Sequence, residues 1–145
     1  MYASDDVRVV PIPLELVPSM WSAALPHLTR GNQVAKMNPV KLLLDLVSRH
    51  AVLWCVFVDD DLVAAYFSSV VLEDDGSKSL MVFGLGGRKL RTWLDAMICK
   101  MEAHAVANGC SVASFYGVRG WSRLVPHYQA TPDVEGVTLY QRALT

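Results

Sequence analysis

The stretch SLMVFGLGGRKLRTWLDAMICKMEAHAVANGCSVASFYGVRG, residues 79–120, decides the expected fold of this chain. It begins with a short apolar run, Ser79 to Phe83, that predicts a strand, and Val112 to Phe115 predicts a second strand. The residues between them are typical of a long helix. A strand, a helix and a strand within about forty residues form a βαβ crossover, which makes the two strands parallel.

The helix of this unit is predicted from the spacing of its apolar residues. They recur at steps of three and four, which lines one helix face: Leu90, Leu94, Met97, Ile98, Met101 and Ala105. Asn108-Gly109 is expected to end the helix, because glycine readily adopts the left-handed capping conformation. Before the helix, glycines and the cations Arg88 and Lys89 stand where free N–H groups and the helix dipole favour an anion.

The composition indicates a single folded domain, residues 1–145. Of these residues 52% are hydrophobic and 19% charged, and the mean hydropathy is +0.28, so we expect a real core and some apolar surface for a partner. The net charge of −1 argues against nucleic acid or an anionic membrane as partner. The sequence has neither an apolar run of roughly 18 residues nor a signal peptide, so cytoplasmic synthesis is expected.

The three cysteines, Cys55, Cys99 and Cys110, predict neither disulfides nor a metal site. Their number is odd and their spacing is not that of metal ligands. We expect buried free thiols, which burial makes unreactive, rather than a nucleophile.

The N-terminal part predicts two helices over a sheet. Val7 to Ile12 is an edge strand or an extended lead-in. Leu14 to Arg30 has helical spacing, and Pro26 should kink or end that helix, with a break at Gly31-Asn32. A second short amphipathic helix is expected over Asn38 to His50.

Three antiparallel strands are expected before the crossover. Ala51 to Val58 and Leu62 to Leu72 are strand-like, and the acidic turn Asp59 to Asp61 separates them. A second turn, Glu73 to Gly76, leads into the strand at Ser79. Turns are required at both acidic clusters, so we interpret these clusters as solvated turns rather than as a cation site.

The C-terminal residues predict a short helix over Ser122 to Tyr128, interrupted by Pro126. A closing strand is expected over Val137 to Leu144, with Leu139 and Val137 facing inward. The expected class is α/β, with a central mixed sheet flanked by helices.

This order of elements resembles the GNAT (GCN5-related N-acetyltransferase) fold over nearly the whole chain. Several short segments are similar, more narrowly, to the short GNAT-like proteins of tailed phages and prophages: Leu53-Trp54, Gly87-Arg88, Trp93-Leu94, Gly109-Cys110 and Gly117 to Trp121. Some GNAT-like phage proteins are virion components. The resemblance therefore implies one GNAT-like domain of phage origin, with the virion as a further location.

The resemblance also implies a coenzyme A site before the long helix. In GNAT enzymes a Gln/Arg-x-x-Gly-x-Gly/Ala loop there cradles the pyrophosphate; the stretch from Met81 matches its glycines but has Met81 for the leading Gln or Arg. The residues implied for acetyl-CoA are Gly84, Gly86, Gly87, Arg88 and Lys89. A plain strand-to-helix turn is the alternative, and the residues leave both open.

The catalytic residues of the family are matched only in part. Many members have a tyrosine in the late short helix that protonates the leaving thiolate; Val125 occupies its place, which leaves Tyr128 as an acid candidate, with packing as its other role. The two central strands contain no carboxylate or histidine, so Glu73 and His127 are the candidates for a base. His104 is expected to be solvated on the polar side of the long helix.

A further candidate group follows the last strand of the crossover. Arg119 is a candidate anion ligand and Trp121 a candidate cleft wall. In the alternative reading Trp121 packs on the core and Arg119 closes a local hydrogen-bond network.

Two function classes follow. The first is a tailed-phage GNAT-like protein acting as a non-catalytic or weakly catalytic virion or interaction module, whose partner is a phage structural protein or a second copy. The altered loop, Val125, the missing base and the apolar composition favour it. The second is an acetyl-CoA-dependent N-acetyltransferase, favoured by the fold and the cationic loop Gly84 to Lys89. The first is preferred, and neither calls for a metal ion.

Overall fold

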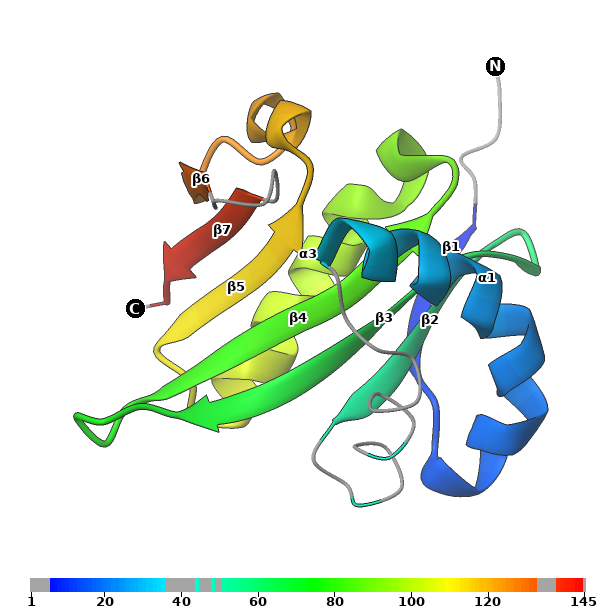
Figure 1. The fold of residues 1–145 in the computed structure, drawn as a ribbon, viewed down its shortest axis with the longest axis horizontal. Coiled ribbons are helices and arrows are strands. Elements are labelled where there is room, and N and C mark those ends of the chain that lie inside the picture. The colour runs from blue at the N-terminus through cyan, green and yellow to red at the C-terminus, as the bar shows by residue number, and fades with distance from the viewer. Residues whose placement is uncertain (1–5, 36–43, 45–47, 49–50, 133–137, 145) are drawn as a thin grey trace.

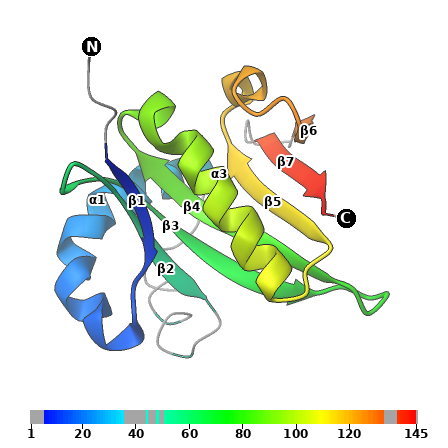
Figure 2. The ribbon, with the colours of Figure 1, turned by 180° about the vertical axis from the view of Figure 1, so that it is seen from behind.

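Seven strands of the described residues form one mixed sheet with a helix on each face (Figures 1 and 2). The computed structural model describes residues 6–35, 44, 48, 51–132 and 138–144. The strands are β1 (Val7–Pro11), β2 (Val52–Val58), β3 (Asp61–Leu72), β4 (Lys78–Gly87), β5 (Val112–Gly117), β6 (Gln129–Pro132) and β7 (Thr138–Ala143). The helices are α1 (Val17–Ala35) and α3 (Leu90–Ala107), with the 3₁₀ turns η1 (Leu14–Leu16) and η2 (Arg119–Arg123).

The strand order is β1-β2-β3-β4-β5-β7-β6. Only the central pair, β4 and β5, is parallel among the described strands, and α3 connects it. The predicted meander followed by a βαβ crossover is therefore confirmed, as is the α/β class with a mixed sheet.

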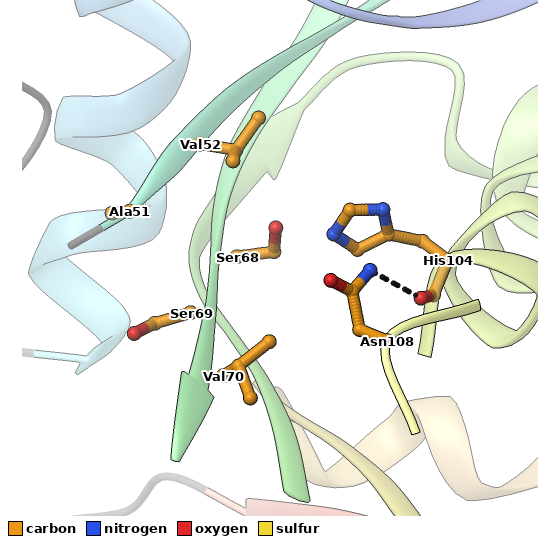
Figure 3. A pocket seen from close by; sticks show the side chains of 7 residues that line it. All are labelled: Ala51, Val52, Ser68, Ser69, Val70, His104 and Asn108. Carbon is orange, nitrogen blue, oxygen red and sulfur yellow. Dashed lines mark hydrogen bonds between the residues drawn. The ribbon is translucent and has the colours of Figure 1, made fainter. Parts of the chain in front are cut away.

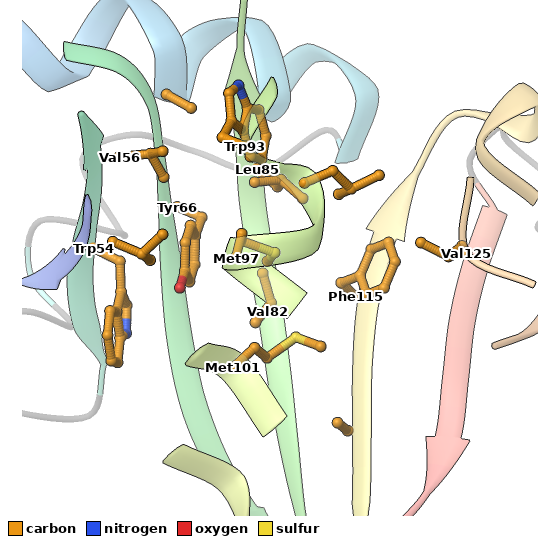
Figure 4. Close-up of a cluster of buried hydrophobic side chains, with 14 of the residues drawn as sticks. Trp54, Val56, Tyr66, Val82, Leu85, Trp93, Met97, Met101, Phe115 and Val125 are labelled. Carbon is orange, nitrogen blue, oxygen red and sulfur yellow. The ribbon is translucent and has the colours of Figure 1, made fainter. Parts of the chain in front are cut away.

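The sheet carries a separate apolar core on each face. Alternation along β2 sends Leu53 and Cys55 toward α1, whereas Trp54 and Val56 point toward α3. Figure 4 shows the α3 side, where Trp54, Tyr66, Met97 and Phe115 lie in one cluster. Trp93 in this cluster is 1% exposed, and burial of such a side chain stabilises the fold by about 2 kcal/mol.

Helix α3 follows its predicted pattern closely. Its buried residues are Trp93, Leu94, Met97, Met101 and Ala105. At its end Gly109 has φ +74°, and the N–H of Cys110 donates to the Ala105 carbonyl at 2.9 Å. That bond from beyond the helix to its last turn is the expected glycine cap.

The β2–β3 connection is the predicted hairpin turn, shortened to the two residues Asp59 and Asp60 because Asp61 already belongs to β3. Asp59 and Asp60 have φ of 51° and 71°, which is the backbone of a type I′ turn and matches the twist of the strands. The Asp59 carboxylate also accepts the N–H of Asp6 at 2.9 Å. The second predicted turn is confirmed by a bond from the Gly76 N–H to the Glu73 carbonyl at 3.0 Å.

Helix α1 departs from its prediction. It runs through Pro26 and past Gly31-Asn32 to Ala35, so the predicted break there is wrong. Proline costs a helix interior about 3 kcal/mol, and burial of Ala24 and Leu28 against the sheet offsets this cost. Its two halves run in different directions in Figure 1, consistent with a kink. The second predicted helix, over 38–50, lies outside the described residues except for Leu44 and Ser48.

Two C-terminal predictions also need correction. The short helix is η2, earlier than the predicted Ser122 to Tyr128, and residues 129–132 form the unpredicted strand β6. In β7 the buried side chains are Thr138 and Tyr140 rather than Leu139, because the register against β5 places the opposite set inward; Val137 lies outside the described residues. Neither described helix combines the length and apolar character needed to cross a membrane.

The pairing of β4 with β3 predicts a strict requirement at Gly87. A Cβ there would lie 2.5 Å from the Ala64 Cβ and would overlap the Val63 carbonyl. Gly87→Ala should therefore lower the free energy of unfolding by about 1–3 kcal/mol in urea denaturation. The matched control is Gly120→Ala, since a Cβ at Gly120 meets nothing within 4 Å. Equal stability of the two variants would contradict the close strand approach.

Candidate active site between strands β4 and β5

The candidate site is the opening where two parallel strands part. Hydrogen-bonded pairing of β4 with β5 ends at Val82 and Phe115. Beyond it, β4 continues along β3 to Gly87, while β5 continues along β7 to Gly117. Figure 1 shows the two strands diverging at these carboxyl ends. A crevice at the carboxyl ends of parallel strands is a usual ligand site in α/β folds.

The glycine-rich segment belongs to β4 and is not a loop. Gly86 and Gly87 pair with Ala65 and Ala64 of β3. Ahead of them the register shifts, so that Gly84 and Leu85 both lie opposite Tyr66 of β3, which is a β-bulge in β4. The expectation of a Gly84–Lys89 loop is corrected: only Arg88 and Lys89 connect strand and helix.

The connection places α3 directly at the opening. Lys89 has φ +60°, a left-handed conformation, and precedes the first helical residue without a side-chain cap. The first N–H groups of a helix have no intrahelical acceptor and carry its positive dipole end. They therefore form an anion-attracting edge beside β4.

Arg88 is directed away from this edge. Its guanidinium donates to the Asp61 carboxylate at 2.7 Å, and its carbonyl accepts the Trp93 indole N–H at 2.7 Å. Its backbone N–H donates to the Val63 carbonyl at 2.8 Å. These contacts fix Arg88 against the β2–β3 turn, so it does not supply a free cation to the opening.

Two other arginines line a pocket at the same end of the molecule. Arg91 of α3 and Arg123 of η2 border a cavity of about 480 Å³, together with Gly120, Ser122 and Leu124. Sequence analysis missed both arginines, although Arg91 directly follows the predicted helix start. The side chain of the predicted candidate Arg119 lies outside the described side chains.

Trp121 packs onto the end of β5. A Cβ on Gly117 would overlap its indole ring, and its ring centroid lies 6.3 Å from that of Phe115. Trp121 is half-buried and contacts the core on the α3 side. The structure thus shows the packing role, at the border of the opening.

Tyr128 lies in the core on the α3 side of the sheet. It is 7% exposed, and its hydroxyl donates to Glu102 of α3 at 2.6 Å. Burial and this carboxylate raise the pKa of Tyr128. Glu102 in turn accepts from Arg142 of β7 at 3.1 Å, so the tyrosine belongs to a bridge between α3 and the C-terminal strand. Val125 is buried in the same core.

The structure does not place the base candidates Glu73 and His127 together at the opening. Glu73 lies in the β3–β4 turn, just before β4 begins at Lys78, whereas the opening starts beyond Val82, roughly 20 Å farther along the extended strand. His127 is exposed between η2 and β6. Glu73 is therefore too distant to act on a ligand between β4 and β5.

A second pocket lies at the other end of α3 (Figure 3). His104 and Asn108 face Ser68 of β3 across a cavity of about 530 Å³. His104 packs edge-on against Trp54, with ring centroids 5.1 Å apart, and burial lowers its pKa. The helix pattern predicted a solvated His104, whereas its ring is half-buried and packs on Trp54. Nearby, the Tyr66 hydroxyl is buried without a hydrogen-bond partner in the described part of the chain.

The cysteines are free thiols, and two of them are buried. Burial raises the pKa of Cys55 to about 11 and also raises that of Cys110. Cys99 is exposed on α3, which corrects the expectation that all three are buried. Neither buried thiol has the lowered pKa of a nucleophile.

The Tyr128 bridge yields a stability prediction. Tyr128→Phe leaves the Glu102 carboxylate without its 2.6 Å donor, so the free energy of unfolding should fall by about 1–3 kcal/mol, measured by urea denaturation. Tyr116→Phe, on the half-buried end of β5, is the control and should change it by less than about 0.5 kcal/mol. An unchanged Tyr128→Phe stability would mean that the bridge contributes nothing.

Comparison with known proteins supports the fold. No family model and no curated sequence matches the chain. FeeM, an N-acyl amino acid synthase from uncultured soil microbes, has a TM-score of 0.69 at 8% identity, over 96% of this chain and 91% of its own. A probable acetyltransferase from Staphylococcus epidermidis gives 0.68 at 8%, covering 97% and 100%. The PaiA N-acetyltransferase from Thermoplasma acidophilum, in complex with coenzyme A, gives 0.61 at 12%, covering 96% and 99%. The chain therefore has the fold of GNAT-type N-acetyltransferases.

Proposed function

We propose that this chain binds an acyl-coenzyme A and transfers its acyl group to an amine. The observation that carries the proposal is the parting of β4 and β5 after Val82 and Phe115, directly beside the start of α3. The coenzyme A complex of the similar PaiA protein supports this choice of ligand. The N-acyl amino acid synthase among the similar structures supports transfer of an acyl group to an amine.

The residues at the opening fit such a ligand at two points. Beyond Val82, β4 is no longer hydrogen-bonded to β5. The backbone N–H and C=O groups on this edge of β4 can therefore pair with the amides of the pantetheine arm. At the outer end, the first turn of α3 and the arginines Arg91 and Arg123 offer donors for phosphates. Gly87 lacks a side chain because β3 lies too close to allow one. The glycine is therefore explained by strand packing and does not by itself indicate a phosphate site.

The chain's contribution to the chemistry is mainly positional. A bound acyl-coenzyme A supplies a thioester, whose carbonyl carbon bonds to the amine nitrogen while the carbon–sulfur bond breaks and the amine proton ends on the thiol. The bulge at Gly84 and Leu85 turns backbone groups out of the regular ladder, and an N–H there polarises the carbonyl. The Tyr128 hydroxyl donates its hydrogen bond to Glu102, and its pKa is raised, so we assign Tyr128 no role as a general acid.

A second candidate function is a non-catalytic interaction module, as in the GNAT-like phage proteins. Two observations favour it: the engaged Tyr128, and three consecutive exposed apolar residues, Val70, Val71 and Leu72, at the β3–β4 hairpin. An exposed apolar run is a usual mark of a protein contact. Its partner would be a virion protein or a second copy, and co-purification with capsid or tail proteins would support it.

The deciding experiment is calorimetric titration with acetyl-CoA. Acyl-coenzyme A binding predicts a dissociation constant in the micromolar range, about −8 kcal/mol, and release of free thiol when a panel of amines is added. The control titration uses acetyl-pantetheine, which lacks the nucleotide and should bind much more weakly. The absence of heat at millimolar acetyl-CoA, with the protein folded, would reject the acyltransferase and leave the interaction module.

A further inference from the structure

We propose that the pocket between Arg91 and Arg123 is a phosphomonoester subsite that recognises the 3′-phosphate of a coenzyme A nucleotide. This inference rests on the acyl-coenzyme A binding proposed above. Arg91 and Arg123 then decide whether the nucleotide is preferred with or without its 3′-phosphate.

Arg91 and Arg123 differ from the other described arginines in their partners. Arg8, Arg88 and Arg142 each contact a carboxylate oxygen, at 2.9, 2.7 and 3.1 Å. Arg91 and Arg123 are the two arginines with described side chains that have no carboxylate partner in the described part of the chain, and they line the same cavity. Two guanidinium groups that border one cavity give it a positive potential that favours an anion.

The shape and chemistry of the cavity also favour a phosphate. Its volume of about 480 Å³ is that of a small-ligand site. Ser122 adds a hydroxyl donor, and the side of Gly120 where a Cβ would stand is open to at least 4 Å. Guanidinium groups bind phosphate oxygens through paired, charge-assisted N–H donors, a geometry that a sugar hydroxyl does not match.

The cavity lies beside the opening between β4 and β5. Arg91 lies on the helix that follows β4, and Arg123 lies on the 3₁₀ turn that follows β5. The cavity is therefore bordered by the two elements that leave the diverging strands. A ligand whose thioester arm lies between the strands has its nucleotide end at this border, where a phosphate on the ribose reaches both arginines.

The test compares coenzyme A with dephospho-coenzyme A, which lacks only the 3′-phosphate. The wild-type protein should bind coenzyme A at least about tenfold more tightly by calorimetry. Arg91→Ala and Arg123→Ala should each bring this ratio close to one, by weakening coenzyme A while leaving dephospho-coenzyme A unchanged. Arg91→Lys should retain part of the preference. Lys100→Ala, an exposed cation farther along α3, is the control and should keep the full ratio.

The outcomes separate this inference from the acyltransferase proposal. Equal binding of both nucleotides by the wild type, or an equal loss of both in the arginine variants, would overturn the 3′-phosphate subsite but keep acyl-coenzyme A binding. Binding of adenosine 3′,5′-bisphosphate without any binding of coenzyme A would keep a phosphomonoester site for another ligand and overturn the acyltransferase. No binding of any probe would overturn both. Thermal unfolding of each variant shows that it is folded.

Discussion

The divergence of β4 from β5 is the constraint on which the functional end of this molecule depends. β4 stays paired with β3 as far as Gly87 because Gly86 and Gly87 lie against Ala65 and Ala64, where little side-chain volume separates the strands. β5 instead follows β7, fixed at its end by the contact between Gly117 and Trp121. The two strands therefore part without losing their outer partners, and α3 starts beside the resulting opening.

The distribution of positive charge follows from the same arrangement. Because β4 runs on to Gly87, the short connection that follows keeps Arg88 beside β3 and the β2–β3 turn, within reach of Asp61. The next arginine along the chain, Arg91, lies in the first turn of α3 and lines the pocket shared with Arg123. The anion-binding capacity of this end thus lies on the helix and on η2, rather than in the glycine-rich segment.

The two ends of α3 have different characters. Its first turn offers N–H groups and Arg91 to the opening, whereas its second half is tied to the rest of the fold by polar side chains. Glu102 joins Tyr128 and Arg142 in one bridge, and His104 packs on Trp54 beside a second cavity. This division explains how a tyrosine near the end of the chain serves stability while the candidate chemistry lies elsewhere.

The sequence by itself determined the order of the described strands and helices up to β5, the parallel β4–β5 pair and the cap at Gly109, because these depend on local periodicity and turn chemistry. It also predicted both hairpin turns, since Asp59, Asp60 and Gly76 tolerate the required positive φ. It did not predict the extension of β4 through its glycines, the helix through Pro26 or the partners of Arg88 and Tyr128. Those features depend on strand register and on residues distant in the chain, such as Ala64, Asp61 and Glu102, and so only the tertiary structure decided them.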